Sequence, residues 1–531
     1  MAKNIDFTSK NNYTTTTKSN KKLNELKNKL KSFYESLDEK TKNIIDTLNS
    51  GTKVFLTGAA GTGKTYTTKL TQKYFGLKYE IEYFEELESG TEEDDIIKKG
   101  VAYTSSTGVS ALINNGITIH KLLKSGISQD LTQLEAWDNS RTSYMAGLLA
   151  RKNPNLSEKE LFIKAKKILK NKLRNELKSV GLLIVDEVSM LDAYFLEIIK
   201  KRLNYYNPDI QVLFVGDFAQ LPPVSKTSQK NFMFENPSFN EYQLALLTEV
   251  KRTTDPKLIK VLGELRLGQA SQETINFLYS RNIPYDREQE RISTHLFSLK
   301  KDVIDKNAEM LNQLDEKEIT LCGKAVLGLP SSEKFKSFLK KSNIEEQIKI
   351  KNGARIIFTV NQIGGSDYIN GEIGTVVRIE RPNTKSPTIY IKRDRDGNVV
   401  GIDRHEFTEW KIVESIEYKR YKGKTHAVKS FTLEPELIYA QYPFALGYAT
   451  TIHKSQGSSI DNLIVDCKGI FEYGQFYVAI SRATSSKGLF LKNFNEGFIK
   501  AHPEVVDYYD NLEQIVAQKD DKISKEQLCK F

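Results

Sequence analysis

The chain of 531 residues has only three cysteines, and they lie far apart at Cys322, Cys467 and Cys529. This spacing forms neither a disulfide framework nor a zinc motif, so we expect a reducing, cytosol-like compartment. The sequence also lacks an apolar run of the roughly 20 residues that span a bilayer. Its first residues lack the apolar core of a signal peptide. These absences exclude a disulfide-rich secreted chain and predict a cytoplasmic protein that does not bind membranes.

The composition is that of an ordinary globular protein with a basic balance. Hydrophobic residues make up 39% and charged residues 27% of the chain, and the formal net charge is +10. The length allows about three or four domains. A basic balance favours a polyanionic partner such as nucleic acid. A lysine-rich chain without such a partner is the alternative that composition alone leaves open.

A glycine-rich loop follows an apolar segment early in the chain. Residues 54–57 predict a buried strand, and residues 58–65 match the phosphate-loop pattern G-x-x-x-x-G-K-[ST]. Such glycines let backbone N–H groups face phosphate oxygens at the start of a helix. Lys64 can reach the β- and γ-phosphates and Thr65 can ligate Mg²⁺, whereas the alternative is a chance glycine-rich turn. The expected nucleotide-binding residues are Gly58, Ala59, Ala60, Gly61, Thr62, Gly63, Lys64 and Thr65.

Two further apolar segments end in polar side chains. Residues 182–185 lead into Asp186 and Glu187, and residues 212–215 lead into a segment that contains Gln220. Open α/β sheets bind ligands at the carboxyl ends of their strands. Asp186 can therefore hold Mg²⁺, and Glu187 can orient or deprotonate an attacking water. For Asp186 and Glu187, a strand that ends in a solvated acidic turn is a common alternative. Gln220 can sense the γ-phosphate.

The first part of the chain predicts a tail, an α/β domain and a helical insertion. Residues 1–30 are polar and predict disorder, within a tail at 1–35 that is disordered or helical. Four apolar residues of this tail would share a helical face that packs on the core. The first α/β domain is expected at 36–248, with a solvated acidic insertion at 80–95 and a helical insertion at 124–180. Ser157-x-x-Glu160 is a capping box within the latter. The apolar faces comprise Leu23, Leu26, Leu30 and Phe33 in the tail, and Leu161, Ala165, Ile168, Leu169, Leu173 and Leu177 in the insertion.

The second half predicts another α/β domain that is interrupted by a β-rich segment. Tight-turn pairs at Asn370-Gly371 and Asp396-Gly397 separate short β-prone runs. We expect a small antiparallel β-barrel at 368–442, inserted into a second domain made of 249–367 and 443–495, before a tail at 496–531. The expected elements are strands at 291–297, 354–360, 374–379, 388–392 and 398–402, and a helix at 299–311.

Five short motifs follow one another along the chain: Thr107-Gly-Val-Ser-Ala, Thr118-Ile-His, Asp186-Glu-Val-Ser-Met, Gly216-Asp-Phe-Ala-Gln-Leu-Pro-Pro and His453-Lys-Ser-Gln-Gly. In this order they resemble the B branch of the superfamily-1 helicases, which includes the Pif-type, RecD and phage Dda helicases. The resemblance covers about residues 37–490. It implies two RecA-like domains that clamp ATP and translocate 5′-to-3′ on single-stranded DNA. It also implies a wedge inserted in the first domain, here within 124–180, and a β-barrel inserted in the second.

The resemblance also implies roles for individual residues. Arg252 and Arg482 would be arginine fingers that neutralise charge on the γ-phosphoryl group, a task suited to a planar guanidinium. Gly457 would lie at the nucleotide. The family commonly has Gln where this chain has Thr41, which predicts loose nucleotide selectivity. The implied catalytic residues are Lys64, Glu187, Gln220, Arg252 and Arg482, and the implied DNA-facing residues are Thr107, Gly108, His120, Thr451, His453 and Lys454.

The sequence therefore predicts an ATP- and Mg²⁺-dependent 5′-to-3′ DNA helicase. We expect a monomer of a bacterial or phage-infected cell that binds single strands and duplexes with a 5′ single-stranded tail. One alternative is a translocase that remodels protein–DNA complexes with little unwinding. A second alternative is a binding module that is switched by nucleotide and does not translocate, but the sequence around Arg482 argues against it. A third is translocation along RNA instead of DNA.

Overall fold

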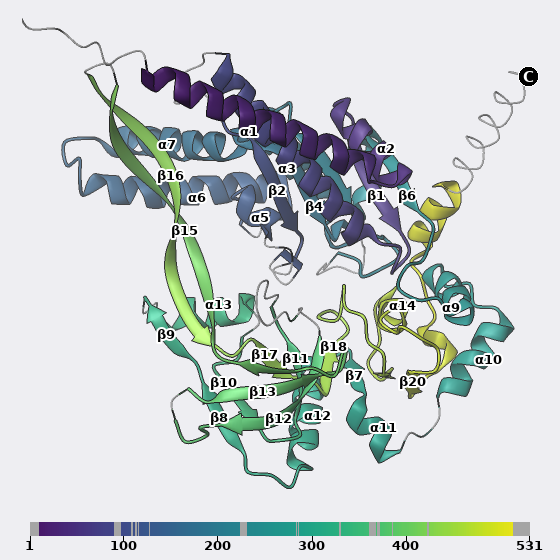
Figure 1. Cartoon of the computed structure of the whole chain (residues 1–531). Coiled ribbons are helices and arrows are strands. Elements are labelled where there is room, and N and C mark those ends of the chain that lie inside the picture. Colours follow the sequence, from purple (N-terminus) through teal and green to yellow (C-terminus); the bar gives the residue numbers. More distant parts are fainter. Residues whose placement is uncertain are drawn as a thin grey trace, which may run out of the picture. The chain divides into compact units, whose positions relative to one another are not determined.

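In the computed structural model the chain folds into two units (Figure 1). The first unit contains the residues up to Gly58, Gly63–Gly216 and Pro223–Thr248, and the second contains Ala59–Thr62, Asp217–Pro222 and the residues from Glu249. The residues described are 10–89, 97–107, 110–111, 114, 116–126, 128–223, 231–282, 284, 286–328, 331–342, 344–360, 368, 372–384, 386–421 and 424–512. Each unit has its own parallel sheet.

The first unit is built on a six-stranded sheet in the order β3-β2-β4-β5-β1-β6. Its neighbouring strands are parallel throughout. All seven residues of β4 are buried, as expected for a strand covered on both faces. The strands are β1 (Lys53–Gly58), β2 (Gly100–Ser105), β3 (Ile117–Thr118), β4 (Val180–Asp186), β5 (Gln211–Val215) and β6 (Tyr242–Leu247).

Helices accompany this sheet, and none of the described helices is both long and apolar enough to cross a membrane. The core beside the sheet joins Ile45 and Leu48 with Phe75 and with the strand residues Ile184 and Leu213. The helices are α1 (Lys10–Glu35), α2 (Glu39–Asn49), α3 (Lys64–Glu88), α5 (Ile119–Leu122), α6 (Leu131–Ala150), α7 (Glu158–Lys178) and α8 (Ala193–Tyr206), with 3₁₀ turns η2 (Val188–Met190), η3 (Met233–Glu235) and η4 (Pro237–Glu241).

The N-terminal helix corrects two of the sequence predictions. Disorder was expected for residues 1–30, within a tail at 1–35 that was expected to be disordered or helical; α1 begins at Lys10, so the helical alternative holds for the described part of the tail. Its predicted apolar face is confirmed, because Leu23 and Leu26 are buried against Leu77 and Ile81 of α3. The acidic insertion expected at 80–95 is also wrong for residues 80–88, which form the last turns of α3. Carboxylates in these turns pair with lysines of α1, as in the 2.7 Å contact between Lys27 and Glu85. Residues 90–95 of the expected insertion lie outside the described residues.

The insertion at 124–180 contains a helical hairpin, in which α6 and α7 run side by side (Figure 1). The capping box at the start of α7 is confirmed, because Ser157 and Glu160 exchange both of its hydrogen bonds. Four of the six apolar positions expected on α7 are buried, but Ile168 is 39% exposed. The hairpin therefore packs through one side of α7 and leaves the other side open to solvent.

The second unit contains a four-stranded parallel sheet in the order β18-β7-β19-β20. The strand expected at 291–297 is confirmed only from Thr294, because residues before it form α11, whose first turn is capped by Asp286. A further helix occupies residues 503–512. The elements around this sheet are α9 (Pro256–Arg266), α10 (Gln272–Arg281), α11 (Arg287–Ile292), β7 (Thr294–Phe297), α12 (Lys300–Asn312), β18 (Ala449–Thr451), β19 (Leu463–Asp466), α14 (Gln475–Ile480), β20 (Leu489–Lys492) and the 3₁₀ turn η5 (Glu496–Phe498).

The β-rich segment forms antiparallel sheets, of which the largest has the order β14-β13-β12-β11-β17. The three strands expected between 374 and 402 lie in it as β12, β13 and β14. Closure into a barrel stays a prediction, and Asn370-Gly371 lies outside the described residues. The elements are β8 (Ile319–Cys322), β9 (Lys324–Leu327), α13 (Ser332–Lys341), β10 (Gln347–Ile350), β11 (Arg355–Phe358), β12 (Ile373–Glu380), β13 (Thr388–Arg393), β14 (Val399–Ile402), β15 (His405–Tyr421), β16 (Lys424–Gln441) and β17 (Phe444–Leu446).

A long two-stranded ribbon is the element that the sequence did not predict. Strands β15 and β16 contain 17 and 18 residues and pair from His405↔Gln441 to Tyr421↔Lys424. At its base β16 also pairs with β9. Figure 1 shows the ribbon projecting well beyond the five-stranded sheet.

Candidate active site

The phosphate loop joins β1 to α3 in the predicted place. Gly58, Gly61 and Gly63 have φ angles of 155°, 83° and 91°, a region that side chains with a Cβ rarely adopt. The ammonium of Lys64 donates a hydrogen bond of 2.7 Å to the carbonyl of Gly58. Thr65 is exposed at the start of α3. A loop of this shape at a helix N-terminus suits a phosphate group.

Two acidic residues end β4 at the same edge of the sheet. Strand β5 lies between β1 and β4, and all three are parallel, so their carboxyl ends meet at one edge. The carboxylate of Asp186 accepts hydrogen bonds from the Tyr103 hydroxyl and from the Glu187 backbone N–H, the latter at 2.9 Å. Burial raises the pKa of Asp186, while these bonds and the charge of Lys64 act in the opposite direction.

Glu187 has a backbone conformation that is unusual for a residue with a side chain. Its φ and ψ are 55° and 45°, in the left-handed region. The hydroxyl of Ser106 donates a 2.8 Å hydrogen bond to its carbonyl, which helps to hold this turn. Strained residues of this kind occur often at functional sites. Together, Asp186 and Glu187 form an acidic pair of the kind that hydrolysis of a phosphoanhydride uses.

The residues present fit a magnesium ion held jointly with a phosphate. Mg²⁺ prefers oxygen ligands and commonly takes only one or two from protein, with the rest from phosphate and water. Asp186 and Thr65 offer such oxygens. Within the described part of the chain, no cluster of three or more His, Cys, Asp or Glu side chains is placed to hold a metal ion by itself.

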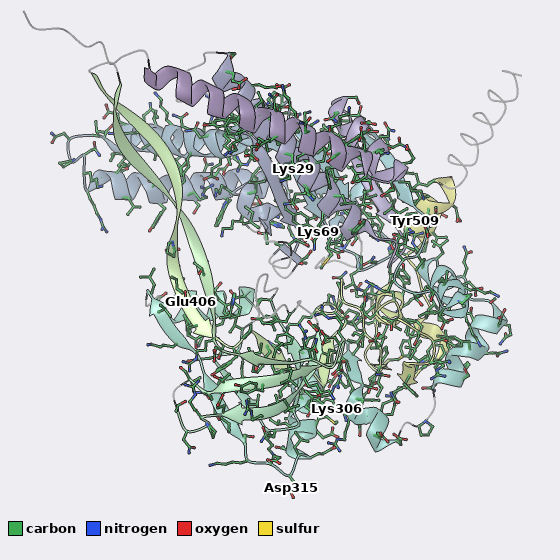
Figure 2. The ribbon with its side chains drawn as sticks, viewed as in Figure 1. Lys29, Lys69, Lys306, Asp315, Glu406 and Tyr509 are labelled. Carbon is green, nitrogen blue, oxygen red and sulfur yellow. The ribbon has the colours of Figure 1, made fainter. Side chains whose placement is uncertain are left out.

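A buried polar cluster in the second unit surrounds Asp217. Its carboxylate, which is fully buried, accepts hydrogen bonds from Arg266 and from the hydroxyls of Tyr477 and Tyr509. The guanidinium carbon of Arg266 also lies 4.0 Å from the centre of the Tyr509 ring. Figure 2 labels Tyr509 on the last described helix. Sequence patterns did not predict this cluster, because its members come from four distant segments.

The cluster reaches the tip of the phosphate loop, which belongs to the same unit. The backbone N–H of Ala60 donates a 2.8 Å hydrogen bond to the hydroxyl of Tyr477. Gln220 is buried, and its backbone N–H donates to the carbonyl of Asp217 at 2.9 Å. The tip of the loop is therefore connected to Asp217 through one tyrosine.

The two predicted finger arginines both contact Ser481. Arg252 donates from Nη1 to the Ser481 carbonyl at 2.6 Å, and Arg482 donates from Nη2 to the Ser481 hydroxyl at 2.7 Å. Arg482 is only 2% exposed and also donates to the carbonyls of Val478 and Ser455. Burial lowers the pKa of Arg252. The structure thus brings both side chains to the same residue, at the end of α14.

The residues expected to face DNA fall into two groups. In the first unit, Thr107 accepts a hydrogen bond from the Ser110 backbone N–H, and the ring of His120 packs 4.4 Å from the ring of Phe195. Burial lowers the pKa of His120, so the ring is neutral at pH 7. Gly108 lies outside the described residues.

In the second unit, the candidate DNA-facing residues lie at the end of β18 and in the turn after it. Thr451 is buried and accepts a 3.2 Å hydrogen bond from the backbone N–H of Lys454. His453, Lys454 and Gly457 are exposed, and Gly457 has a φ of 81°. Thr451 therefore shapes the turn that presents the other three residues to solvent.

Thr41 stabilises the start of a helix. It stands at the position where the superfamily-1 helicases of the B branch commonly have Gln. It is buried, and both its backbone N–H and its hydroxyl donate to the Asp38 carboxylate, at 2.9 and 2.8 Å. Asp38 is the N-cap of α2. The hydroxyl of Thr41 is thus engaged in capping a helix.

Comparisons of the sequence with known proteins give matches that cover much of the chain. A family model described as an AAA domain matches residues 37–283. The chain is 30% identical over 482 residues to the ATP-dependent DNA helicase Pif1 of Campylobacter jejuni, covering 86% of this chain and 94% of that protein.

Solved structures with a similar fold include two of Pif1 from Bacteroides. The one in complex with ADP-AlF4 has a TM-score of 0.64 at 22% identity, and covers 90% of this chain and 97% of that one. The one with ADP-AlF3 and single-stranded DNA has a TM-score of 0.54 at the same identity and coverage. At this level of identity, the similarity shows a shared fold.

Proposed function

Since this chain belongs to the Pif1 family of DNA helicases, we propose that it hydrolyses ATP to move 5′-to-3′ along single-stranded DNA and to separate duplex strands. The observation that carries the proposal is the edge of the six-stranded sheet. There the phosphate loop of β1 and the Asp186–Glu187 pair of β4 lie on either side of β5. This arrangement combines a site for the phosphates with the acidic groups that hydrolysis requires.

The nucleotide and its cation would be held by residues of the phosphate loop and β4. Backbone N–H groups of the loop and the ammonium of Lys64 would bind the phosphates, and Thr65 and Asp186 would hold Mg²⁺. The cation would neutralise phosphate charge. Glu187 would accept the proton of the attacking water.

The arginines and the remaining motif residues would complete the ATPase cycle and bind the DNA. Arg252 and Arg482 would neutralise charge that develops on the γ-phosphoryl group, a role suited to planar guanidinium groups. Gln220 and Gly457 would lie at the nucleotide. Thr107, His120, Thr451, His453 and Lys454 would contact the DNA strand, with opening and closing of the two domains moving it.

A strand-displacement assay under single-turnover conditions tests the proposal. The substrates are the same duplex with a 5′ tail, a 3′ tail or blunt ends, and the readout is release of the labelled strand. We expect ATP-dependent opening of the 5′-tailed duplex and little opening of the other two. Preferential opening of the 3′-tailed duplex would contradict the polarity, and hydrolysis stimulated by single strands without any opening would favour a translocase that remodels protein–DNA complexes.

A further inference from the structure

The helical hairpin of the first unit carries an excess of positive charge. Residues 131–178 contain eleven Lys or Arg and five Asp or Glu, whereas the whole chain of 531 residues has a net charge of only +10. Most of these cations lie on α7. Figure 2 shows side chains projecting from the hairpin. A local excess of this size marks a surface that attracts polyanions.

Six exposed cations share the solvent side of α7, and we call this surface the α7 basic face. Residues four apart on a helix form one ridge along it. One such ridge contains residues 166, 170, 174 and 178. The neighbouring ridge contains residues 159 and 167. The buried residues of α7, such as Leu161 and Ala165, form a separate ridge that faces the protein. The members of the α7 basic face are Lys159, Lys166, Lys167, Lys170, Arg174 and Lys178.

Carboxylates neutralise little of this face: its two ridges hold a single acidic residue, Glu158 in the first turn, and no ion pair among the described residues joins it to a member of the face. No Asp or Glu occurs between Glu160 and Glu176. Glu160 is bound to Ser157 in the capping box, and Glu176 forms a 2.9 Å ion pair with Lys124. Among the ion pairs of the described residues, none involves a member of the α7 basic face. Lys170 instead lies 5.3 Å from the centre of the Tyr205 ring.

We propose that the α7 basic face binds the phosphate backbone of double-stranded DNA. From Lys159 to Lys178 the helix spans about 28 Å at 1.5 Å per residue. This length approaches the repeat of B-form DNA, roughly 34 Å. A row of cations along one helix suits the regularly spaced phosphates of a stiff duplex, whereas single strands are held largely by aromatic stacking. The one aromatic residue of α7, Phe162, is half-buried. The inference rests on the proposed function only in taking DNA as the substrate, and it adds a contact to the duplex.

The test compares two double variants of the full chain. Lys166→Gln/Lys167→Gln removes two cations from the face, and Lys29→Gln/Lys31→Gln removes two exposed cations from α1 (Figure 2 labels Lys29). Binding of a blunt duplex of roughly two helical turns is measured by fluorescence anisotropy across a series of salt concentrations. For the first variant we expect the Kd at about 0.1 M salt to rise by about tenfold or more, and the slope of log K against log salt to fall by about 2.

The controls separate this inference from the proposed function. The face variant should keep hydrolysis stimulated by single strands at the wild-type rate, and the α1 variant should bind the duplex as the wild type does. An unchanged duplex Kd in the face variant, or an equal loss in both variants, would overturn the inference. Arg174→Gln/Lys178→Gln provides a second variant, and thermal melting confirms that each variant is folded. Absence of DNA-stimulated hydrolysis in the wild type would count against the helicase, not against duplex binding.

Discussion

The guanidinium of Arg266 and the carboxylate of Asp217 form an ion pair in the interior of the second unit, with Nη2 and Oδ1 3.0 Å apart. The side chain of Asp217 is fully buried and that of Arg266 is 11% exposed. Burial by itself would lower the pKa of Arg266, but the charge of Asp217, the nearby Tyr509 and Tyr477 and the hydrogen bond to Asp217 together outweigh it and raise that pKa. Removing one member of such a pair leaves the other charge buried and uncompensated.

The substitution Arg266→Met should therefore destabilise the protein. The change leaves the Asp217 carboxylate buried without its cation, which costs about 3–5 kcal/mol. Urea unfolding monitored by tryptophan fluorescence and circular dichroism measures the loss. The control is Lys260→Met, which breaks the exposed pair with Glu273 and should change the midpoint little. Similar midpoints for the two variants would contradict a special role for the buried pair.

Glu187→Gln should abolish turnover while keeping nucleotide binding. The amide preserves the size of the side chain but cannot accept the proton of water, so we expect kcat to fall by about 10²–10⁴. Steady-state hydrolysis and equilibrium binding of ATP with Mg²⁺ are measured on the same preparation. Lys64→Ala is the comparison, because it should weaken binding of the phosphates as well. Hydrolysis by Glu187→Gln at the wild-type rate would show that another group activates the water.

Arg482→Lys should lower kcat by about 10³ with a smaller change in the affinity for ATP. A lysine keeps the charge but not the planar group that reaches three acceptors at once. The matched control is Arg281→Lys, since Arg281 also donates to two backbone carbonyls, those of Leu489 and Lys487. A loss confined to ATP affinity, or equal losses in both variants, would argue against a finger role.

Thr41→Val should affect stability more than nucleotide choice. The substitution removes the hydroxyl that donates to Asp38, which should cost about 1 kcal/mol of stability. The ratio of ATP hydrolysis to GTP hydrolysis should stay within about twofold of the wild-type ratio, because the hydroxyl of Thr41 donates to the N-cap Asp38 and not to the nucleotide base. Thermal melting and parallel assays with both nucleotides measure the two effects. A large shift in nucleotide preference would show that Thr41 contacts the base after all.

His295→Phe should reduce the loss of stability in acid. Burial lowers the pKa of His295 to about 4, and the charge of Lys306 acts in the same direction. The unfolded chain, whose histidine has a pKa near 6.5, then binds a proton before the folded protein does, so stability falls as the pH drops from about 6.5 to 4. Between about pH 6.5 and 5 this amounts to about 2 kcal/mol, at roughly 1.4 kcal/mol per pH unit.

Unfolding midpoints of the wild type and the variant, measured from about pH 8 to pH 5, test this sign. The two curves should run parallel above about pH 7.5 and converge in acid, where the wild type loses the contribution of its neutral histidine. Parallel curves over the whole range would show that His295 does not titrate differently on unfolding.

The sequence correctly predicted those elements whose structure depends on a local pattern of residues. The phosphate loop, the Asp186–Glu187 pair and the capping box of α7 depend on residues close together in the chain, and each was predicted from them. Tyr103 was missed, since its hydroxyl meets Asp186 only because β2 pairs with β4 across an intervening insertion. A tyrosine near the end of a strand carries no signal of that partner.

The elements that failed prediction depend on partners elsewhere in the chain. Helix α1 is polar on average and becomes ordered through its apolar face against α3. The ribbon of β15 and β16 was missed because strand preference depends strongly on the surroundings. The cluster around Asp217 could not be predicted from local patterns either, because its arginine and two tyrosines come from separate helices.

The contact between Tyr509 and Asp217 also has a consequence for synthesis. The two residues are 292 positions apart, so a ribosome makes the carboxylate long before it makes the hydroxyl that will bind it. During translation the nascent second unit must keep Asp217 hydrated, or paired with Arg266 and Tyr477 alone. Helix 503–512 therefore supplies the last partner, and a premature stop codon even a few codons before Tyr509 would leave this buried acid incompletely satisfied in an otherwise nearly full-length product.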